Sequence, residues 1–220
     1  MDKLIQEYFD QKAYQKDQTE LREIMNNFGS DKGSGHHNYT SFYDRLFNYL
    51  KDKEINLFEM GLGTNNPNLP STMGVNAKPC ASHYGWNKYF KNGKIYGADI
   101  DRDILIYTDD IKTWYCDQTI PTDIEHLFKN DDLKDIEFDI IIDDGLHTFN
   151  ANFTFFRNSI HKLKKGGIFI IEDLLPDVAK TFDQIKDNLK LEFGLEYIQV
   201  LRIPNPYNYS FDNTLLVVQK

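Results

Sequence analysis

The sequence predicts an α/β protein built around a doubly wound, mostly parallel sheet. Two short apolar runs that end in acid support this prediction, FDIIIDDGLH (Phe138–His147) and GGIFIIEDL (Gly166–Leu174). Unalternating Ile and Phe residues bounded by glycine and charge are typical of strands that are buried on both faces of a parallel sheet. A third run, Ile55–Met60, opens directly onto Gly61-Leu-Gly63, as a strand does when a helix follows it.

Length and composition fit one globular domain. The chain has 220 residues, of which 40% are hydrophobic and 27% are charged, and this is enough for one sizeable core. We expect a single domain in which residues 1–53 form a helical N-terminal extension and residues 54–220 form the sheet core. The net charge of −9 argues against nucleic acid or an anionic membrane surface as the main partner.

The sequence favours a cytoplasmic location. Its two cysteines, Cys80 and Cys116, make no disulfide framework, which is typical of a reducing compartment. The N-terminal residues are too charged for a signal peptide, and no apolar run approaches the length that spans a bilayer.

The N-terminal part is predicted to be mostly helical. Apolar residues recur at helical spacing from Asp2 to Asn27, and a glycine-containing loop, Phe28–Tyr43, precedes a helix over Ser41–Lys51. His36 and His37 lie in this loop. Adjacent histidines without further ligands at the usual spacing are weak indicators of a metal site.

Strands and helices alternate through the rest of the chain. A long insert rich in Asn and Pro, Thr64–Lys78, is predicted to fold over a bound ligand before a helix at Ala81–Phe90. Thr122-Asp-Ile-Glu125 matches a capping box at the start of a short helix. The other expected elements are strands at Lys94–Ala98, Ile111–Cys116, Phe138–Ile142, Ile168–Ile171, Tyr197–Arg202 and Thr214–Val218, and helices at Phe149–Leu163 and Pro176–Leu189.

The first strand ends in a glycine turn that suits a nucleotide-containing ligand. Gly61 and Gly63 let the backbone approach such a ligand closely. Asn66 stands where the third glycine of a GxGxxG fingerprint belongs, so the pattern argues against a dinucleotide site. Asp99 ends the next strand, at a position where an acid commonly holds the ribose hydroxyls of an adenosine-containing ligand.

Acidic residues and a histidine are predicted to meet at the carboxyl edge of the sheet. They are Asp143, Asp144, Glu172 and Asp173, which end two strands, and His147 on the turn after the first of them. Burying several charged groups together in a hydrophobic core costs free energy, so the grouping indicates a metal site or an acid/base site. The alternative is that the acids cap the following helices, with Asp144 or Asp173 as an N-cap residue.

The order of these motifs resembles that of the class I S-adenosylmethionine methyltransferases. The resemblance covers nearly the whole chain and is closest to the metal-dependent sugar O-methyltransferases of the mycinamicin and macrocin type. It implies a Rossmann-like doubly wound sheet of about seven strands, mostly parallel with an antiparallel C-terminal strand, and N-terminal helices that cover the cofactor site. The matching segments are FEMGLGT (Phe58–Thr64), YGADID (Tyr96–Asp101), IKTWYCDQT (Ile111–Thr119), IIDDGLH, IIEDL and SDKGSGHHNY (Ser30–Tyr39).

The resemblance also implies roles for individual residues. By analogy with the mycinamicin-type enzymes, Asp144, Glu172 and Asp173 would ligate Mg²⁺, or Mn²⁺ in its place, and His147 would be the general base. Oxygen ligands suit these ions better than zinc, and histidine ordinarily titrates near neutral pH. The residues expected to contact S-adenosylmethionine are Tyr39, Glu59, Gly61, Gly63, Asp99, Asp117, Gln118 and Asp143.

The predicted function is S-adenosylmethionine- and Mg²⁺-dependent O-methyl transfer to a sugar hydroxyl of a surface-polysaccharide or natural-product precursor. The macrolide enzymes often have a larger N-terminal part, so the shape of their acceptors does not carry over. Proteins of bacterial capsule polysaccharide pathways are also similar to this chain. An alternative acceptor is therefore a capsule phosphoramidate or phosphate oxygen, or an amine.

A second alternative is a non-catalytic nucleotide-binding protein of the same fold, which would not need the base His147 beside a metal. A third, a nicotinamide-dependent enzyme, is disfavoured by Asn66. The expected partner is a small molecule, and the sequence leaves open whether the chain forms a homo-oligomer. The insert Asn65–Lys78 and the aromatic segment Pro206–Phe211 are expected to line the acceptor pocket.

Overall fold

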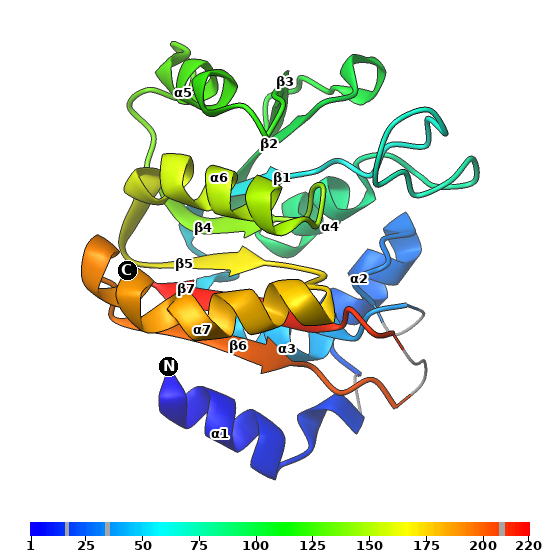
Figure 1. The fold of residues 1–220 in the computed structure, drawn as a ribbon. Helices are drawn as coiled ribbons and strands as arrows, with labels where there is room; N and C mark the ends of the chain where they lie inside the picture. The colour runs from blue at the N-terminus through cyan, green and yellow to red at the C-terminus, as the bar shows by residue number, and fades with distance from the viewer. Residues whose placement is uncertain (16–17, 34–35, 207–209) are drawn as a thin grey trace.

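Seven strands form one sheet in the order β3-β2-β1-β4-β5-β7-β6 (Figure 1). The computed structural model describes residues 1–15, 18–33, 36–206 and 210–220. Neighbouring strands run parallel except at β7, which is antiparallel to both β5 and β6. The strands are β1 (Glu54–Met60), β2 (Asn92–Asp99), β3 (Ile111–Tyr115), β4 (Phe138–Asp143), β5 (Leu163–Ile171), β6 (Tyr197–Arg202) and β7 (Thr214–Gln219). The predicted fold class is confirmed.

The strand order reverses at β1, which pairs with β2 on one side and β4 on the other. In open α/β sheets such a reversal leaves a crevice at the carboxyl ends of the strands, where ligands bind. The register places Met60 beside Ala98 of β2 and Asp143 of β4. The glycine turn after β1 therefore lies between the strand ends that carry Asp99 and Asp144.

Helices cover both faces of the sheet (Figure 1). The helices α1–α4 pack against one face through residues such as Phe42 and Trp86, and α5–α7 pack against the other through Phe155 and Phe182. Burying a side chain of this size stabilises the fold by ~1.5–3 kcal/mol. The helices are α1 (Asp2–Asp10), α2 (Glu20–Phe28), α3 (Tyr39–Phe47), α4 (Ala81–Tyr89), α5 (Pro121–Lys129), α6 (Phe149–Ser159) and α7 (Pro176–Phe193).

Local sequence explains several helix ends. The Thr19 side chain caps α2 by accepting a hydrogen bond from the Arg22 N–H at 3.2 Å. Helix α7 begins at Pro176, as predicted, and its C-cap residue is Gly194, whose φ of +61° suits glycine. Among the described residues, no helix combines the length and the apolar character needed to cross a membrane.

Three local predictions are wrong. Helix α5 begins at Pro121, and its N-cap residue Ile120 makes no side-chain cap hydrogen bond, so the predicted capping box at Thr122 does not form. Strand β5 begins at Leu163, before the predicted start at Ile168, so Gly166 and Gly167 lie inside it, where the register with β4 shifts. Helix α6 ends at Ser159, and a short 3₁₀ turn replaces its predicted last residues.

Candidate active site

A cavity of about 360 Å³ lies at the carboxyl edge of the sheet. Eight of the predicted site residues line it, namely Gly61, Gly63, Asp99, Asp117, Gln118, Asp144, His147 and Asp173. The insert after β1 contributes Pro70 and Met73, and the segment after α2 contributes Ser30 and Asp31. Of the aromatic segment expected at the acceptor pocket, Tyr207, Asn208 and Tyr209 lie outside the described residues.

The glycine turn after β1 is held close to the strand ends on both sides. Gly61 has a φ of +94°, and a Cβ atom there would lie 2.1 Å from the carbonyl oxygen of Asp144. Asp99 accepts hydrogen bonds from the N–H of Leu62 at 2.7 Å and of Asp101 at 2.8 Å. Burial raises the pKa of the Asp99 carboxyl, and these backbone N–H groups oppose the rise. The turn and Asp99 are thus joined by hydrogen bonds and together form one wall of the cavity.

Asp143 organises the turn that follows β4. Its carboxylate is fully buried and accepts hydrogen bonds from Gln118 Nε2 at 3.0 Å and Asn152 Nδ2 at 2.9 Å. The Gln118 side chain in turn accepts from the Leu146 N–H at 2.8 Å, and a Cβ atom on Gly145 would collide with it. Asp143 therefore fixes the position of the loop between Asp144 and His147 and does not itself line the cavity.

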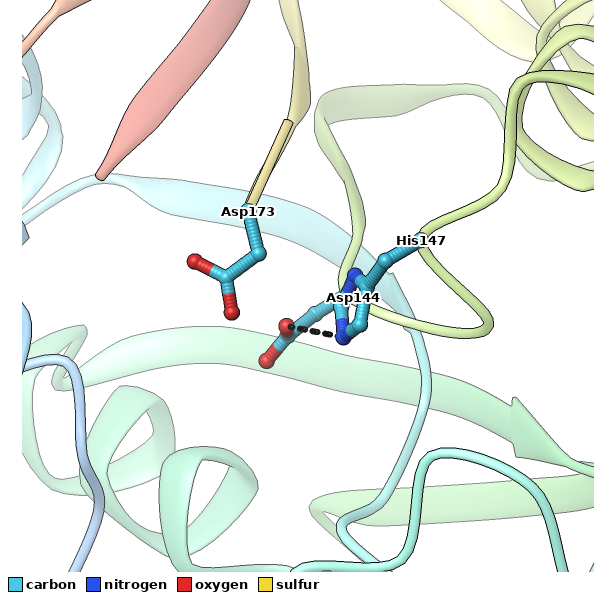
Figure 2. A group of neighbouring side chains, drawn as sticks. All are labelled: Asp144, His147 and Asp173. Carbon is cyan, nitrogen blue, oxygen red and sulfur yellow. Dashed lines mark ion pairs between the residues drawn. The ribbon is translucent and has the colours of Figure 1, made fainter. Parts of the chain in front are cut away.

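Asp144, His147 and Asp173 come together at one end of the cavity (Figure 2). One potential ligand atom of each residue lies within 4.8 Å of those of the other two. His147 Nε2 is 4.0 Å from Asp144 Oδ1, which is too far for a hydrogen bond. The Nδ1 atom of His147 is buried and has no hydrogen-bond partner among the described residues. The predicted convergence of these residues is seen in the structure.

The backbone at this end of the cavity is strained. His147 and Asp173 have φ values of +59° and +53°, in the left-handed region that residues other than glycine rarely adopt. Such conformations tend to occur at functional sites. The helix-capping alternative for the acids is wrong, because the N-cap residues of α6 and α7 are Thr148 and Leu175.

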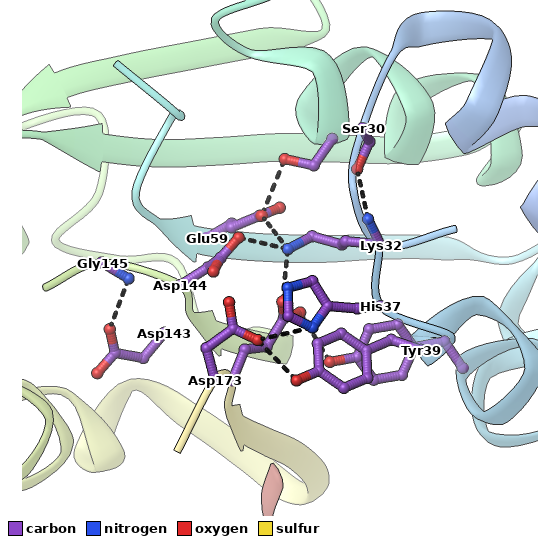
Figure 3. A network of polar contacts seen from close by, with 12 residues as sticks. Ser30, Lys32, His37, Tyr39, Glu59, Asp143, Asp144, Gly145 and Asp173 are labelled. Atoms are coloured by element: carbon purple, nitrogen blue, oxygen red, sulfur yellow. Dashed lines mark hydrogen bonds and ion pairs between the residues drawn. The ribbon is translucent and has the colours of Figure 1, made fainter. Parts of the chain in front are cut away.

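Lys32 reaches into the acidic group from the segment after α2 (Figure 3). Its Nζ atom lies 2.5 Å from Asp144 Oδ2, 2.7 Å from Glu172 Oε2 and 3.2 Å from Glu59 Oε1. The Lys32 side chain is 1% exposed. Burial alone lowers the pKa of Lys32, but the carboxylates of Asp144, Glu172 and Glu59 outweigh it and raise that pKa well above its usual value.

Sequence reasoning does not single out Lys32. The only signal is its place within SDKGSGHHNY, a segment that resembles the same family as a whole. Its partners Asp144 and Glu172 are 112 and 140 residues away in the chain. Neither motif spacing nor helical periodicity predicts a contact between residues so far apart in the chain.

Two tyrosines and a histidine bind the acids after β5. Tyr39 donates a hydrogen bond to Asp173 Oδ1 at 2.6 Å, and Tyr43 donates to Glu172 Oε1 at 2.7 Å. His37 Nδ1 lies 3.4 Å from Asp173 Oδ1, and its ring stacks on Tyr39. Burial raises the pKa of Asp173 to about 6, although His37 opposes the rise. Tyr39, a predicted cofactor contact, thus supports Asp173 and does not line the cavity.

Glu59 and Glu172 are buried and do not line the cavity. Glu59 accepts hydrogen bonds from Ser82 Oγ at 2.9 Å and Trp86 Nε1 at 2.6 Å, in addition to the contact with Lys32. Both oxygens of Glu172 are engaged, one by Lys32 and the other by Tyr43. The predicted roles of Glu59 as a cofactor contact and of Glu172 as a metal ligand stay predictions.

The fold is that of the class I S-adenosylmethionine methyltransferases. The chain matches the MycE methyltransferase of the mycinamycin biosynthetic pathway, solved in complex with Mg and SAH (S-adenosylhomocysteine), with a TM-score of 0.71. The match covers 91% of this chain and 54% of that chain at 21% sequence identity. No protein-family model matches the chain.

In sequence, the chain is homologous to sugar O-methyltransferases of the tetracenomycin, macrocin and mycinamicin type. It is 30% identical over 162 residues to the 8-demethyl-8-alpha-L-rhamnosyl tetracenomycin-C 2'-O-methyltransferase of Streptomyces olivaceus. It is 29% identical over 155 residues to the demethylmacrocin O-methyltransferase of Streptomyces fradiae. These alignments cover 73% and 70% of this chain but only 39% and 36% of the relatives.

Proposed function

We propose that this chain is an S-adenosylmethionine- and Mg²⁺-dependent O-methyltransferase that acts on a sugar hydroxyl. One observation carries the proposal. A single cavity joins the glycine turn and Asp99 with the group of Asp144, His147 and Asp173. A cofactor site and an acid/base site in one cavity are what a transfer reaction between two bound molecules requires.

The glycine turn and Asp99 support the cofactor part of the proposal. Gly61 and Gly63 leave backbone exposed at the end of β1, where the amino acid part of S-adenosylmethionine can approach. Each carboxylate oxygen can accept two hydrogen bonds, so Asp99 can bind ribose hydroxyls while it keeps its bonds to Leu62 and Asp101. Asp117 and Gln118 lie beyond Asp99 and would border the adenine.

The donor atoms at the other end of the cavity fit a hard divalent cation. Asp144 and Asp173 offer carboxylate oxygens, which Mg²⁺ and Mn²⁺ prefer. We propose that these two residues hold the ion, with Glu172 as the third ligand predicted from the sequence. When bound, the ion would orient an acceptor hydroxyl and lower its pKa.

His147 is proposed as the general base. A neutral sugar hydroxyl is a poor nucleophile, so its proton must leave as the methyl group arrives. His147 lines the cavity beside Asp144 and can accept that proton at Nε2, while Nδ1 faces away from solvent. Tyr39 and His37 both contact the carboxylate of Asp173 and keep it in place near His147.

The acceptor class is part of the proposal. The relatives are named for sugar-bearing natural products, and this supports a small sugar-containing acceptor over a macromolecule. A precursor of a surface polysaccharide, such as a capsule, also offers a sugar hydroxyl as the methyl acceptor. The proposal places the enzyme in the cytoplasm, in agreement with the unpaired cysteines Cys80 and Cys116.

The test is a screen for transfer of a labelled methyl group. The full chain would be incubated with labelled S-adenosylmethionine, Mg²⁺ and a panel of nucleotide-linked sugars, glycosylated natural products and sugar phosphoramidates. We expect label on a sugar hydroxyl of at least one acceptor. Label on a phosphoramidate or phosphate oxygen alone would overturn the hydroxyl acceptor, and turnover of none would favour a non-catalytic protein of the same fold.

A further inference from the structure

We infer that Lys32 is the built-in counter-ion of the acid cluster formed by Glu59, Asp144 and Glu172, and that it lowers the affinity of the site for divalent cations. The counter-ion role of Lys32 concerns the protein alone. Its effect on metal affinity rests on the proposed function, because it presumes that the site takes a divalent cation.

The ammonium group of Lys32 is enclosed by oxygens from three strand ends. Glu59 belongs to β1, Asp144 follows β4 and Glu172 follows β5, and all three carboxylates are within 3.2 Å of Nζ. Figure 3 shows Lys32 with two of them, Glu59 and Asp144. Glu59 and Glu172 are also almost fully buried. Three carboxylates at this distance would repel one another strongly without a cation between them. Lys32 supplies that cation from the protein itself.

The remaining partners of the acids are neutral or lie farther away. Ser82, Trp86 and Tyr43 donate uncharged hydrogen bonds to Glu59 and Glu172. The other groups near the acids that can take a positive charge are two histidines, each 4.0 Å away: His83 Nδ1 from Glu59 and His147 Nε2 from Asp144. Burial lowers the pKa of His83. Among the described residues, Lys32 is thus the cation that contacts all three acids.

The position of Lys32 opposes a divalent cation. Its Nζ atom lies between Asp144 Oδ2 and Glu172 Oε2, which belong to two of the three predicted metal ligands. An Mg²⁺ ion bound to both oxygens at ~2.1 Å would need the space of the ammonium group. An ion held by the other oxygen of Asp144 would still lie beside a unit positive charge. In both arrangements, Lys32 weakens metal binding.

Substitution of Lys32 by methionine separates this inference from a merely structural role. Lys32→Met keeps much of the side-chain volume and removes the charge. We expect the melting temperature of the metal-free variant to fall by roughly 6–20 °C, because it keeps buried carboxylates without their partner. We expect its Mn²⁺ affinity, measured by calorimetry, to rise at least ~10-fold, since even bulk-water screening leaves that much repulsion between a divalent ion and a nearby unit charge.

Two further variants control the experiment. Lys164→Met removes a lysine that pairs with Asp139 at 2.8 Å, at the opposite end of β4, and should leave Mn²⁺ affinity unchanged. Lys32→Met combined with Glu172→Gln removes one charge of each sign and should recover about half or more of the lost melting temperature. Circular dichroism and SAH binding would show that each variant is folded.

Each outcome decides the inference. A folded Lys32→Met protein whose Mn²⁺ affinity is unchanged or lower would overturn the competition with the metal. A melting temperature as little changed as that of Lys164→Met would overturn the counter-ion role. If the wild type binds SAH but no Mn²⁺, the metal part of the proposed function fails, and the inferred effect of Lys32 on metal affinity fails with it. The melting temperatures still decide the counter-ion role.

Discussion

His147→Ala is expected to lower kcat by ~10²–10⁴-fold, the loss that typically follows removal of a general base. His147 lies in the cavity 4.0 Å from Asp144, so its ring can reach a hydroxyl positioned beside that carboxylate. Folding and SAH affinity should stay close to those of the wild type, because Nδ1 of the ring has no hydrogen-bond partner among the described residues and Nε2 lies 4.0 Å from Asp144. Steady-state kinetics and calorimetry measure the two effects separately.

The control for this variant is His161→Ala, which replaces a histidine on the 3₁₀ turn after α6. It should change kcat little. The size of the fall in kcat for His147→Ala also shows which kind of acceptor oxygen reacts. A fall much smaller than ~10²-fold would indicate an acceptor oxygen that is already ionised, as in a phosphate or phosphoramidate. A matching loss of Mn²⁺ affinity would contradict a role as base alone and make His147 a metal ligand.

Asp144→Asn is expected to lower kcat by ~10²–10³-fold, the loss typical of removing one charge-stabilising group from an active site. Asp144 joins the metal-ligand group and the Lys32 network, and its substitution leaves the cavity with one carboxylate fewer. Wild-type protein treated with excess chelator should lose activity to a similar or larger extent and recover it on addition of Mg²⁺.

Asp183→Asn, on the exposed surface of α7, is the matched control and should behave as the wild type. Full activity of the wild type in excess chelator would contradict the metal requirement. Asp144 and Asp173 would then be left with hydrogen-bonding and electrostatic roles. The SAH affinity of Asp144→Asn, measured in parallel, shows whether the cofactor half of the cavity is intact.

The framework of the site could be predicted because local patterns encode it. The Ile-rich runs of β4 and β5 identify strands buried on both faces, and the acid at the end of each strand follows directly in the sequence. Because β4 and β5 pair in parallel, Asp144 and Asp173 lie at the same edge of the sheet. This could be predicted without any knowledge of side-chain contacts. The same argument places Gly61 and Asp99 on neighbouring strand ends.

The supporting network could not be predicted because it depends on contacts between distant parts of the chain. Lys32 and Tyr43 lie in the N-terminal helical part, yet they bind Glu172 after β5. Nothing in the residues near Glu172 shows that both of its oxygens are engaged. For the same reason, the hydrogen bond from the Tyr39 hydroxyl to Asp173 could not be predicted, and the role of Tyr39 as a cofactor contact stays a prediction.

Competing local signals explain the errors in element boundaries. Thr122 and Glu125 have the spacing of a capping box, but Pro121 is suited to the first helical position and α5 begins there. Gly166 and Gly167 resemble a turn, yet β5 continues through them with an irregular register. At Thr122, two local patterns thus compete over the same few residues, whereas at Gly166 the pairing of β5 with its neighbours overrides the local pattern.

Calorimetric titration of the full chain with SAH tests the central claim most directly. We expect one binding site per chain, a higher melting temperature in the presence of SAH, and no binding of NAD. Asp99→Ala should weaken SAH binding by at least ~10-fold, because a charged hydrogen-bond partner of the ribose is lost. Absence of SAH binding by the wild type, or equal binding of NAD, would contradict the assignment of this chain as an S-adenosylmethionine-dependent methyltransferase.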